Sequence, residues 1–87
     1  VISKNKIELS DTRLIAQVLD GVRSFFASEK VSTIDGVKID FEQDKRWVHL
    51  RRSNTEPIIR IYSEASDKEK ADELASKVID IVKEIIR

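Results

Sequence analysis

The amino-acid sequence predicts an α+β domain with a two-layer sandwich architecture, in which a four-stranded, mainly antiparallel sheet carries two helices on one face. Apolar residues recur at helical spacing near both ends of the chain, whereas the middle alternates apolar and polar residues as strands do. An Asp-Gly pair at residues 35–36 marks a hairpin. With 87 residues the chain is long enough for one small core, so we expect one domain.

Composition narrows the classes of function. The chain has 16 Lys plus Arg and 16 Asp plus Glu, so no net field attracts nucleic acid or an anionic membrane. The absence of cysteine excludes disulfide bonds, thiolate metal ligands and a cysteine nucleophile. No apolar run reaches the roughly 18 residues of a membrane span. We expect a soluble, cytoplasmic domain that binds neither nucleic acid nor a membrane.

The amino-terminal part of the chain is expected to hold one helix. Residues 1–11 alternate only weakly and predict a weak strand or an entering linker. From residue 12 to residue 28 the apolar residues follow one helical face, after a Ser10-Asp11-Thr12 cluster suited to N-capping. Gly21 weakens the middle of this helix by up to about 1 kcal/mol relative to alanine.

The central part of the chain is expected to hold the sheet. Strands are predicted at 32–34, 37–41, 46–52 and 58–64. The Asp35-Gly36 turn joins the first two, because glycine accepts a positive φ. The apolar face, toward the helices, is predicted to carry Val37, Ile39, Phe41, Val48, Leu50, Ile59 and Ile61. The opposite face is predicted to carry Lys38, Asp40, Trp47, His49, Arg51, Arg60, Tyr62 and Glu64.

A second helix is predicted to close the chain. Ser66 and Glu69 have the spacing of a capping box, in which Ser66 caps the helix start and Glu69 reaches back. The apolar stripe that follows consists of Ala71, Leu74, Ala75, Val78, Ile81, Val82 and Ile85. We expect this stripe and the first helix to cover the apolar face of the sheet.

The segment between the last two strands holds the most informative polar residues. Arg51 and Arg60 flank a loop that includes Ser53, Asn54 and Thr55. Arginine presents a planar fork of donors that matches phosphate oxygens, and short polar side chains and loop N–H groups add further donors. Residue types alone leave two interpretations: a phosphate site, or an ordinary polar turn between solvated arginines.

The spacing of this segment resembles a family signature. Arg51-x-Ser53-Asn54-Thr55-Glu56-Pro57-x-x-Arg60-x-x-x-Glu64-Ala65 is similar to the phosphate-binding signature in the last domain of α-D-phosphohexomutases, the phosphoglucomutase and phosphomannomutase family. The resemblance extends to Asp35-Gly36-Val37-Lys38, to Trp47 and to the terminal amphipathic helix. It covers the chain from about residue 12 to the end and is weakest over residues 1–11.

The resemblance implies the C-terminal, TATA-box-binding-protein-like domain of such an enzyme. Residues 12–87 would form this domain, and residues 1–11 would be a linker or weak strand from the domain before it. Arg51, Ser53, Asn54 and Thr55 would bind the phosphate that is not transferred, with Arg60 as a further contributor.

The resemblance assigns the catalytic phosphoserine, the Mg²⁺ ligands and most of the sugar recognition to the other three domains of the polypeptide. No catalytic residue, metal ligand or cofactor is therefore expected in this chain, and we expect the isolated 87-residue chain to be inactive. The implied ligand is a hexose phosphate. Asn54 favours glucose or mannose phosphate, since glucosamine-type relatives tend to have glycine there.

Neighbouring residues have plainer explanations. Glu56 has the wrong charge for a phosphate ligand, so a structural role is expected. Alternation turns Arg52 away from Arg51, and His49 lacks the neighbours of a general base. Trp47 and Tyr62 suit either a stacking platform for bases or a surface covered by another domain. Two rival functions thus remain, a nucleic-acid-binding module and a protein-interaction domain, although the zero net charge argues against the first.

Overall fold

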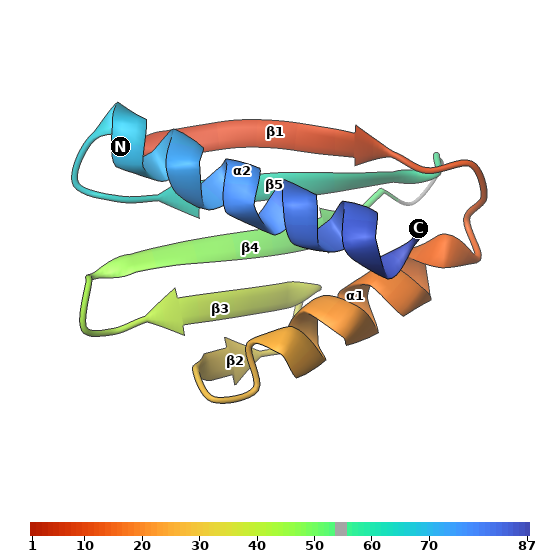
Figure 1. Ribbon diagram of the computed structural model, residues 1–87, viewed down its shortest axis with the longest axis horizontal. Helices are drawn as coiled ribbons and strands as arrows, with labels where there is room; N and C mark the ends of the chain where they lie inside the picture. The colour runs from red at the N-terminus through yellow and green to blue at the C-terminus, as the bar shows by residue number, and fades with distance from the viewer. Residues whose placement is uncertain (54–55) are drawn as a thin grey trace.

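The computed structural model describes residues 1–53 and 56–87. Within these residues, the elements are β1 (Ile2–Glu8), α1 (Leu14–Phe25), β2 (Lys30–Ser32), β3 (Val37–Phe41), β4 (Arg46–Arg52), β5 (Ile58–Glu64) and α2 (Lys68–Ile85). The strands form one antiparallel sheet in the order β1-β5-β4-β3-β2. Both helices lie on the same face of this sheet (Figure 1). The predicted two-layer α+β architecture is confirmed.

The sheet has one strand more than the four predicted. β1 occupies most of the stretch expected to be a weak strand or a linker, and it pairs with β5 from Ile2, opposite Glu64, to Glu8, opposite Ile58. Its weak apolar signal has a physical reason. β1 is an edge strand whose residues alternate between exposed and half-buried, so it needs few apolar side chains.

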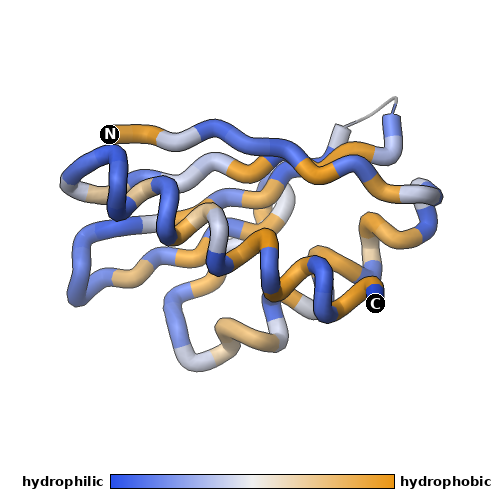
Figure 2. The backbone as a smooth tube through the Cα atoms, turned by 45° about the horizontal axis from the view of Figure 1, so that its top comes forward, coloured by the Kyte–Doolittle hydropathy of each residue, from blue (hydrophilic) through white to orange (hydrophobic). Residues whose placement is uncertain are grey.

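The core lies between the sheet and the helices. Every residue predicted for the apolar sheet face is buried: Val37, Ile39, Phe41, Val48, Leu50, Ile59 and Ile61. The helices add Ile15, Val18 and Val22 from α1, and Ala71, Leu74, Ala75, Val78 and Val82 from α2. Figure 2 shows the alternation of apolar and polar residues along the strands that makes one face of the sheet suitable for this core.

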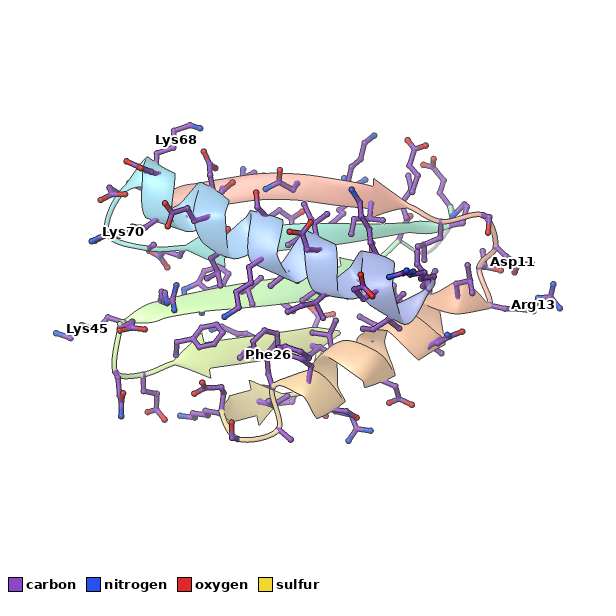
Figure 3. The ribbon with its side chains drawn as sticks, viewed as in Figure 1. Asp11, Arg13, Phe26, Lys45, Lys68 and Lys70 are labelled. Atoms are coloured by element: carbon purple, nitrogen blue, oxygen red, sulfur yellow. The ribbon has the colours of Figure 1, made fainter. Side chains whose placement is uncertain are left out.

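Helix α1 is shorter than the 12–28 range predicted. It begins at Leu14, and its N-cap residue is Arg13 rather than a member of the polar cluster. Asp11 still closes the preceding turn, because its Oδ1 accepts the backbone N–H of Arg13 at 2.8 Å. Hydrogen bonds between the Asp11 carboxylate and Arg13 lower the pKa of Asp11 and raise that of Arg13. Figure 3 shows both side chains in the loop between β1 and α1.

The carboxyl end of α1 decides which of two adjacent phenylalanines enters the core. The helix ends at Phe25, which is 61% exposed, although the apolar helical face predicted over residues 12–28 included it. Phe26 is buried and meets Phe41 edge-on, with 5.5 Å between the ring centroids. Phe26 thus connects the end of the helix to β3.

Gly21 lies where the two helices approach each other. A Cβ atom on Gly21 would lie 2.6 Å from Cδ1 of Ile85, closer than packed carbon atoms allow. The glycine that weakens α1 in isolation therefore permits close packing of α1 against α2.

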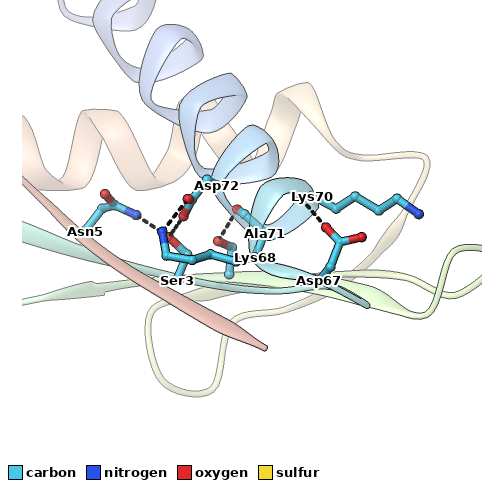
Figure 4. Close-up of polar contacts among 8 residues, drawn as sticks. Ser3, Asn5, Asp67, Lys68, Lys70, Ala71 and Asp72 are labelled. Atoms are coloured by element: carbon cyan, nitrogen blue, oxygen red, sulfur yellow. Dashed lines mark hydrogen bonds and ion pairs between the residues drawn. The ribbon is translucent and has the colours of Figure 1, made fainter.

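Helix α2 begins one residue later than a Ser66 cap requires. Its N-cap is Asp67, whose extended backbone lets Oδ1 accept the backbone N–H of Lys70 at 2.8 Å (Figure 4). A carboxylate satisfies an otherwise free N–H group and also complements the positive end of the helix dipole. The predicted Ser66–Glu69 capping box is therefore wrong.

The first turn of α2 is tied to the sheet by polar contacts, which Figure 4 shows. The buried hydroxyl of Ser63 on β5 donates to the carbonyl oxygen of Ala71 at 2.7 Å. Ser3 Oγ on β1 donates to Asp72 at 2.6 Å, and Lys68 Nζ donates to the same carboxylate at 2.8 Å. Both hydrogen bonds lower the pKa of Asp72, and the bond from Lys68 has the larger effect.

The hairpin between β2 and β3 has a longer loop than predicted. β2 covers Lys30–Ser32 instead of 32–34, and its last residue pairs with Lys38. Gly36 has a φ of 79°, as the Asp-Gly pair indicated, but it stands at the end of the loop next to β3. The predicted strand range is therefore corrected by two residues, and the exposed Ile34 belongs to the loop.

Candidate anion-binding site

Three cationic residues form one row across the open face of the sheet. The β4–β5 register sets Arg51 opposite Arg60, and the β1–β5 register sets Lys6 opposite Arg60. All three residues are exposed. Residues directly opposite each other in a ladder share a face, and like charges in that arrangement repel. The row therefore gathers three positive charges on one face of a chain without net charge, and a bound anion would reduce the repulsion between them.

The signature loop begins at the same end of the sheet. The half-buried Ser53 donates its backbone N–H to the carbonyl oxygen of Ile58 at 3.0 Å, which closes the base of the loop. Of the five residues predicted to bind phosphate, Arg51, Ser53 and Arg60 thus lie at one end of the β4–β5 ladder. Asn54 and Thr55 lie outside the described residues.

Two neighbours of the signature residues, Arg52 and Glu56, were predicted to stand outside the site, and the structure shows where each of them lies. Arg52 is opposite Ile59 in the ladder, so its side chain leaves β4 on the face opposite to that of Arg51. Glu56 is exposed, and its carbonyl oxygen accepts the backbone N–H of Ile58 at 2.8 Å. Its main chain therefore helps to shape the loop.

Arg51 has a partner that sequence reasoning missed. Its Nη2 lies 3.1 Å from Oδ2 of Asp35, and the two side chains are 49% and 66% exposed. The β3–β4 register explains the contact, because Val37 is opposite Leu50 and the residues just before Val37 therefore reach the end of β4. The Asp-Gly pair indicated the turn alone, because the neighbours of Asp35 depend on how the loop lies against β4.

Lys6 is the second residue that sequence reasoning missed. It joins the cationic row only because β1 pairs with β5, a pairing that the weak pattern of residues 1–11 did not establish. Its Nζ lies 4.0 Å from the exposed carboxylate of Glu8, so its charge is only loosely engaged.

The aromatic part of the open face is already engaged by neighbouring side chains. Trp47 donates its indole N–H to Oε2 of Glu64 at 2.5 Å, and Nζ of Lys38 lies 5.0 Å from the centroid of the Trp47 ring. His49 is half-buried, and its Nε2 forms a hydrogen bond with the carbonyl oxygen of Asp35. A base that stacked on Trp47 would compete with Lys38, which weakens the interpretation of this face as a nucleic-acid platform.

Other parts of the structure offer less. A surface hollow of about 770 Å³ is lined only by residues of α2, so no second element converges on it. In residues 1–53 and 56–87, no three His, Cys, Asp or Glu side chains gather as metal ligands would. Nor does any helix described here have the length and apolar character needed to cross a membrane.

Comparisons with known proteins match the part of the chain that contains Arg51, Ser53 and Arg60. The family model for the C-terminal domain of phosphoglucomutase/phosphomannomutase matches residues 4–81. A probable phosphoglucosamine mutase of Pyrococcus horikoshii is 36% identical over 90 residues, covering 100% of this chain and 20% of the relative. The phosphoglucomutase/phosphomannomutase of Thermococcus kodakarensis is 48% identical over 58 residues, covering 67% of this chain and 12% of the relative.

The phosphoglucosamine/phosphogalactosamine mutase of Sulfurisphaera tokodaii is 36% identical over 84 residues, which cover 91% of this chain and 17% of the relative. The chain thus spans a fifth or less of the length of these relatives. The names of these relatives cover phosphoglucomutase, phosphomannomutase, phosphoglucosamine mutase and phosphogalactosamine mutase.

Proposed function

We propose a phosphate-binding role for this chain, which belongs to the C-terminal domain family of phosphoglucomutases and phosphomannomutases. In this role Arg51, Ser53, Asn54 and Thr55 bind the phosphate group of a hexose phosphate that is not being transferred. Arg60 contributes from the neighbouring strand. The observation that supports the proposal best is the position of Arg51 opposite Arg60 at the end of the ladder where the signature loop begins.

The chemistry of the donors fits a phosphate dianion. Two guanidinium groups on one face supply planar, always charged donors, and the serine hydroxyl and loop N–H groups supply short ones. Lys6 adds a third positive charge to the row. A phosphate held from several sides would be fixed in orientation as well as attracted.

In a complete enzyme this grip would act on the reaction at a distance from the reacting bond. Phosphoryl transfer depends on positioning and on charge stabilisation, so holding one phosphate places the other end of the sugar at the catalytic serine of another domain. We propose that the other three domains supply that serine, the Mg²⁺ ligands and most of the sugar recognition. This chain would bind substrate and would not transfer a phosphoryl group.

The proposed ligands are glucose and mannose phosphates. Asn54 supports them, because the resemblance described above implies that glucosamine-type relatives tend to have glycine at this position. Glucosamine phosphates are the natural comparison, because most of the relatives described above are named as phosphoglucosamine mutases.

Titration of the ¹⁵N-labelled chain, followed residue by residue by NMR, tests the proposal. Glucose 1-phosphate, mannose 1-phosphate, glucosamine 1-phosphate and a single-stranded RNA are added in separate series. We expect the sugar phosphates to shift the NMR resonances of Arg51, Ser53 and Arg60. The Kd should be on the order of millimolar, because an exposed site keeps its charges screened.

The matched pair Arg51→Ala and Arg52→Ala provides the control. The first substitution should weaken the binding by about tenfold or more and the second should leave it unchanged, since the two side chains leave β4 on opposite faces. Shifts caused by RNA and centred on Trp47 and Tyr62, with no response to the sugar phosphates, would contradict the proposal and support the nucleic-acid-binding alternative.

A further inference from the structure

The loop between β2 and β3 is fixed against the end of β4. Gly36 has a φ of 79°, and a Cβ atom there would lie 2.1 Å from the carbonyl oxygen of Leu50. Only a residue without a side chain permits this approach. The loop therefore meets β4 at the residue before Arg51, and Asp35 is brought to the side chain of Arg51.

Asp35 has two contacts on the same face of β4. Its backbone carbonyl oxygen accepts a hydrogen bond from Nε2 of His49, which must carry the proton because a carbonyl oxygen can only accept. Its carboxylate lies 3.1 Å from Nη2 of Arg51. His49 and Arg51 are two residues apart on one strand, so their side chains share a face. The contact with His49 therefore holds the backbone of Asp35 in the place from which its carboxylate reaches Arg51.

The Asp35 carboxylate lies at one corner of the Arg51 guanidinium. The ion pair brings Oδ2 of Asp35 to 3.1 Å from Nη2 of Arg51. A guanidinium carries five N–H donors in a rigid plane, so a partner at one corner sets the direction of the others. A phosphate can approach another edge of the same plane while Asp35 keeps its place.

We infer that Asp35 is a positioning residue for Arg51, holding its guanidinium in the orientation that a phosphate meets at the end of β4. Asp35 acts through Arg51 and touches no ligand itself. The inference rests on the proposed function of Arg51. The ion pair is half-exposed, and such pairs stabilise a fold little, so its effect belongs to the site rather than to the fold.

The sign of one measurement separates this role from a simple charge effect. Removal of a carboxylate beside an anion site makes the local potential more positive, and charge alone then predicts tighter phosphate binding. Loss of orientation predicts weaker binding, because the side-chain entropy of a free arginine must be given up when the anion binds. The two effects are opposite in direction.

The experiment titrates inorganic phosphate into the ¹⁵N-labelled chain at low salt, and it follows the backbone N–H and the side-chain Nε–H of Arg51. Asp35→Ala should weaken binding by about two- to fivefold, the range expected for one exposed ion pair. Asp35→Glu keeps the carboxylate and should recover most of the affinity. Asp40→Ala is the control, since Asp40 is another acidic residue of the open face and pairs with Lys38 at 3.9 Å; it should not weaken binding.

Further measurements distinguish the positioning role of Asp35 from a change in the fold and from failure of the proposed function. Unchanged resonances of Val37 and Leu50 in the Asp35 variants show that the loop still lies against β4. Phosphate binding by Asp35→Ala that is as tight as in the unsubstituted chain, or tighter, would overturn the inference, as would Asp35→Glu that binds no better than Asp35→Ala. Arg51→Ala is titrated alongside: if it binds phosphate normally, the proposed function itself is wrong, whereas its loss of binding with no effect of Asp35→Ala removes only the positioning role.

Discussion

Two adjacent arginines illustrate how strand geometry separates residues that look alike in the sequence. Arg51 and Arg52 are both exposed, yet Arg51 is opposite Arg60 on the open face and Arg52 is opposite Ile59 on the other. The carboxylate of Asp35 forms an ion pair with Arg51. The alternation of side chains along a strand was enough to predict this difference.

The shape of the Arg51 side chain can be separated from its charge. Hydrogen bonds to a charged group contribute about 1.5–3 kcal/mol, so Arg51→Ala should weaken the binding of inorganic phosphate by about tenfold or more. Arg51→Lys keeps the charge but not the planar fork, and we expect it to recover only part of that loss. NMR titration of the two variants measures this, and a lysine variant that binds like the unsubstituted chain would show that charge alone matters.

The two glycines of the chain should respond differently to alanine. Gly36→Ala combines a φ of 79° with a clash against the backbone of Leu50, so we expect a loss of about 1–3 kcal/mol in the free energy of unfolding. Gly21→Ala meets only side-chain atoms of Ile85, at 2.6 Å for Cδ1 and 3.0 Å for Cγ1 and Cγ2, and gains up to about 1 kcal/mol in helix propensity, so we expect a smaller loss. Urea unfolding compares them, and equal losses would show that the turn is not constrained in this way.

At the scale of elements, prediction was best where two independent signals agreed. β3, β4 and β5 have the predicted bounds, because strict alternation and turn residues define them together. α1 and α2 were recognised from their apolar spacing, but their first residues were not, since neighbouring polar residues compete for the cap. β1 was the least certain element, because its pairing with β5 is long-range and leaves no local signal.

The assignment of sheet faces leads to a stability prediction. Leu50 and Ile61 are fully buried beneath the helices, so truncation of either to alanine should lower the free energy of unfolding by about 2–5 kcal/mol. Lys4→Ala, on the exposed face of β1, serves as the comparison and should have little effect. Urea denaturation measures all three variants. Effects of the core substitutions as small as that of Lys4→Ala would mean that the two faces are assigned the wrong way round.

The attachment of α2 to β1 should depend on pH. The pKa of Asp72 is lower in the folded chain than its ordinary value of 3.8, because Lys68 and Ser3 donate to the carboxylate. A depressed pKa means that this stabilisation is complete above pH 3.8 and is lost as the pH falls below that value through the folded pKa.

Asp72→Asn should therefore reduce the dependence of unfolding free energy on pH below 3.8. Ser3→Ala removes the smaller contribution and should reduce that dependence less. Unfolding midpoints recorded from pH 7 to pH 2 make the comparison, and an identical acid dependence in the Asp72 variant and the unsubstituted chain would contradict it.

At the scale of the whole molecule, the residues of the proposed site lie at one end of the sheet, and the helices leave the open face of the sheet uncovered (Figure 1). The signature residues could be proposed from the sequence because they are close together along the chain. Asp35 and Lys6 could not, because strand pairing brings them to Arg51 and Arg60 from distant segments. The local part of the proposed site could therefore be named from the sequence, and the long-range part required the structure.

The proposed division of labour between domains gives a prediction for the chain by itself. We expect the pure 87-residue chain to convert no glucose 1-phosphate into glucose 6-phosphate, because the phosphoserine and the metal-binding loop are proposed to belong to other domains. A coupled assay with added Mg²⁺ and glucose 1,6-bisphosphate measures this. Turnover that increases with the concentration of the chain would contradict the prediction.

The most direct test of the proposed phosphate grip compares two single substitutions in the complete polypeptide that carries this chain. KM and kcat are measured for glucose 1-phosphate, mannose 1-phosphate and glucosamine 1-phosphate with Arg51→Ala and with Arg52→Ala. We expect Arg51→Ala to raise the KM for the preferred substrate by about tenfold or more, while Arg52→Ala leaves it within about twofold. Equal increases in KM for the two variants would show that the substrate responds only to the net positive charge of this region. That result would contradict a phosphate site built around Arg51.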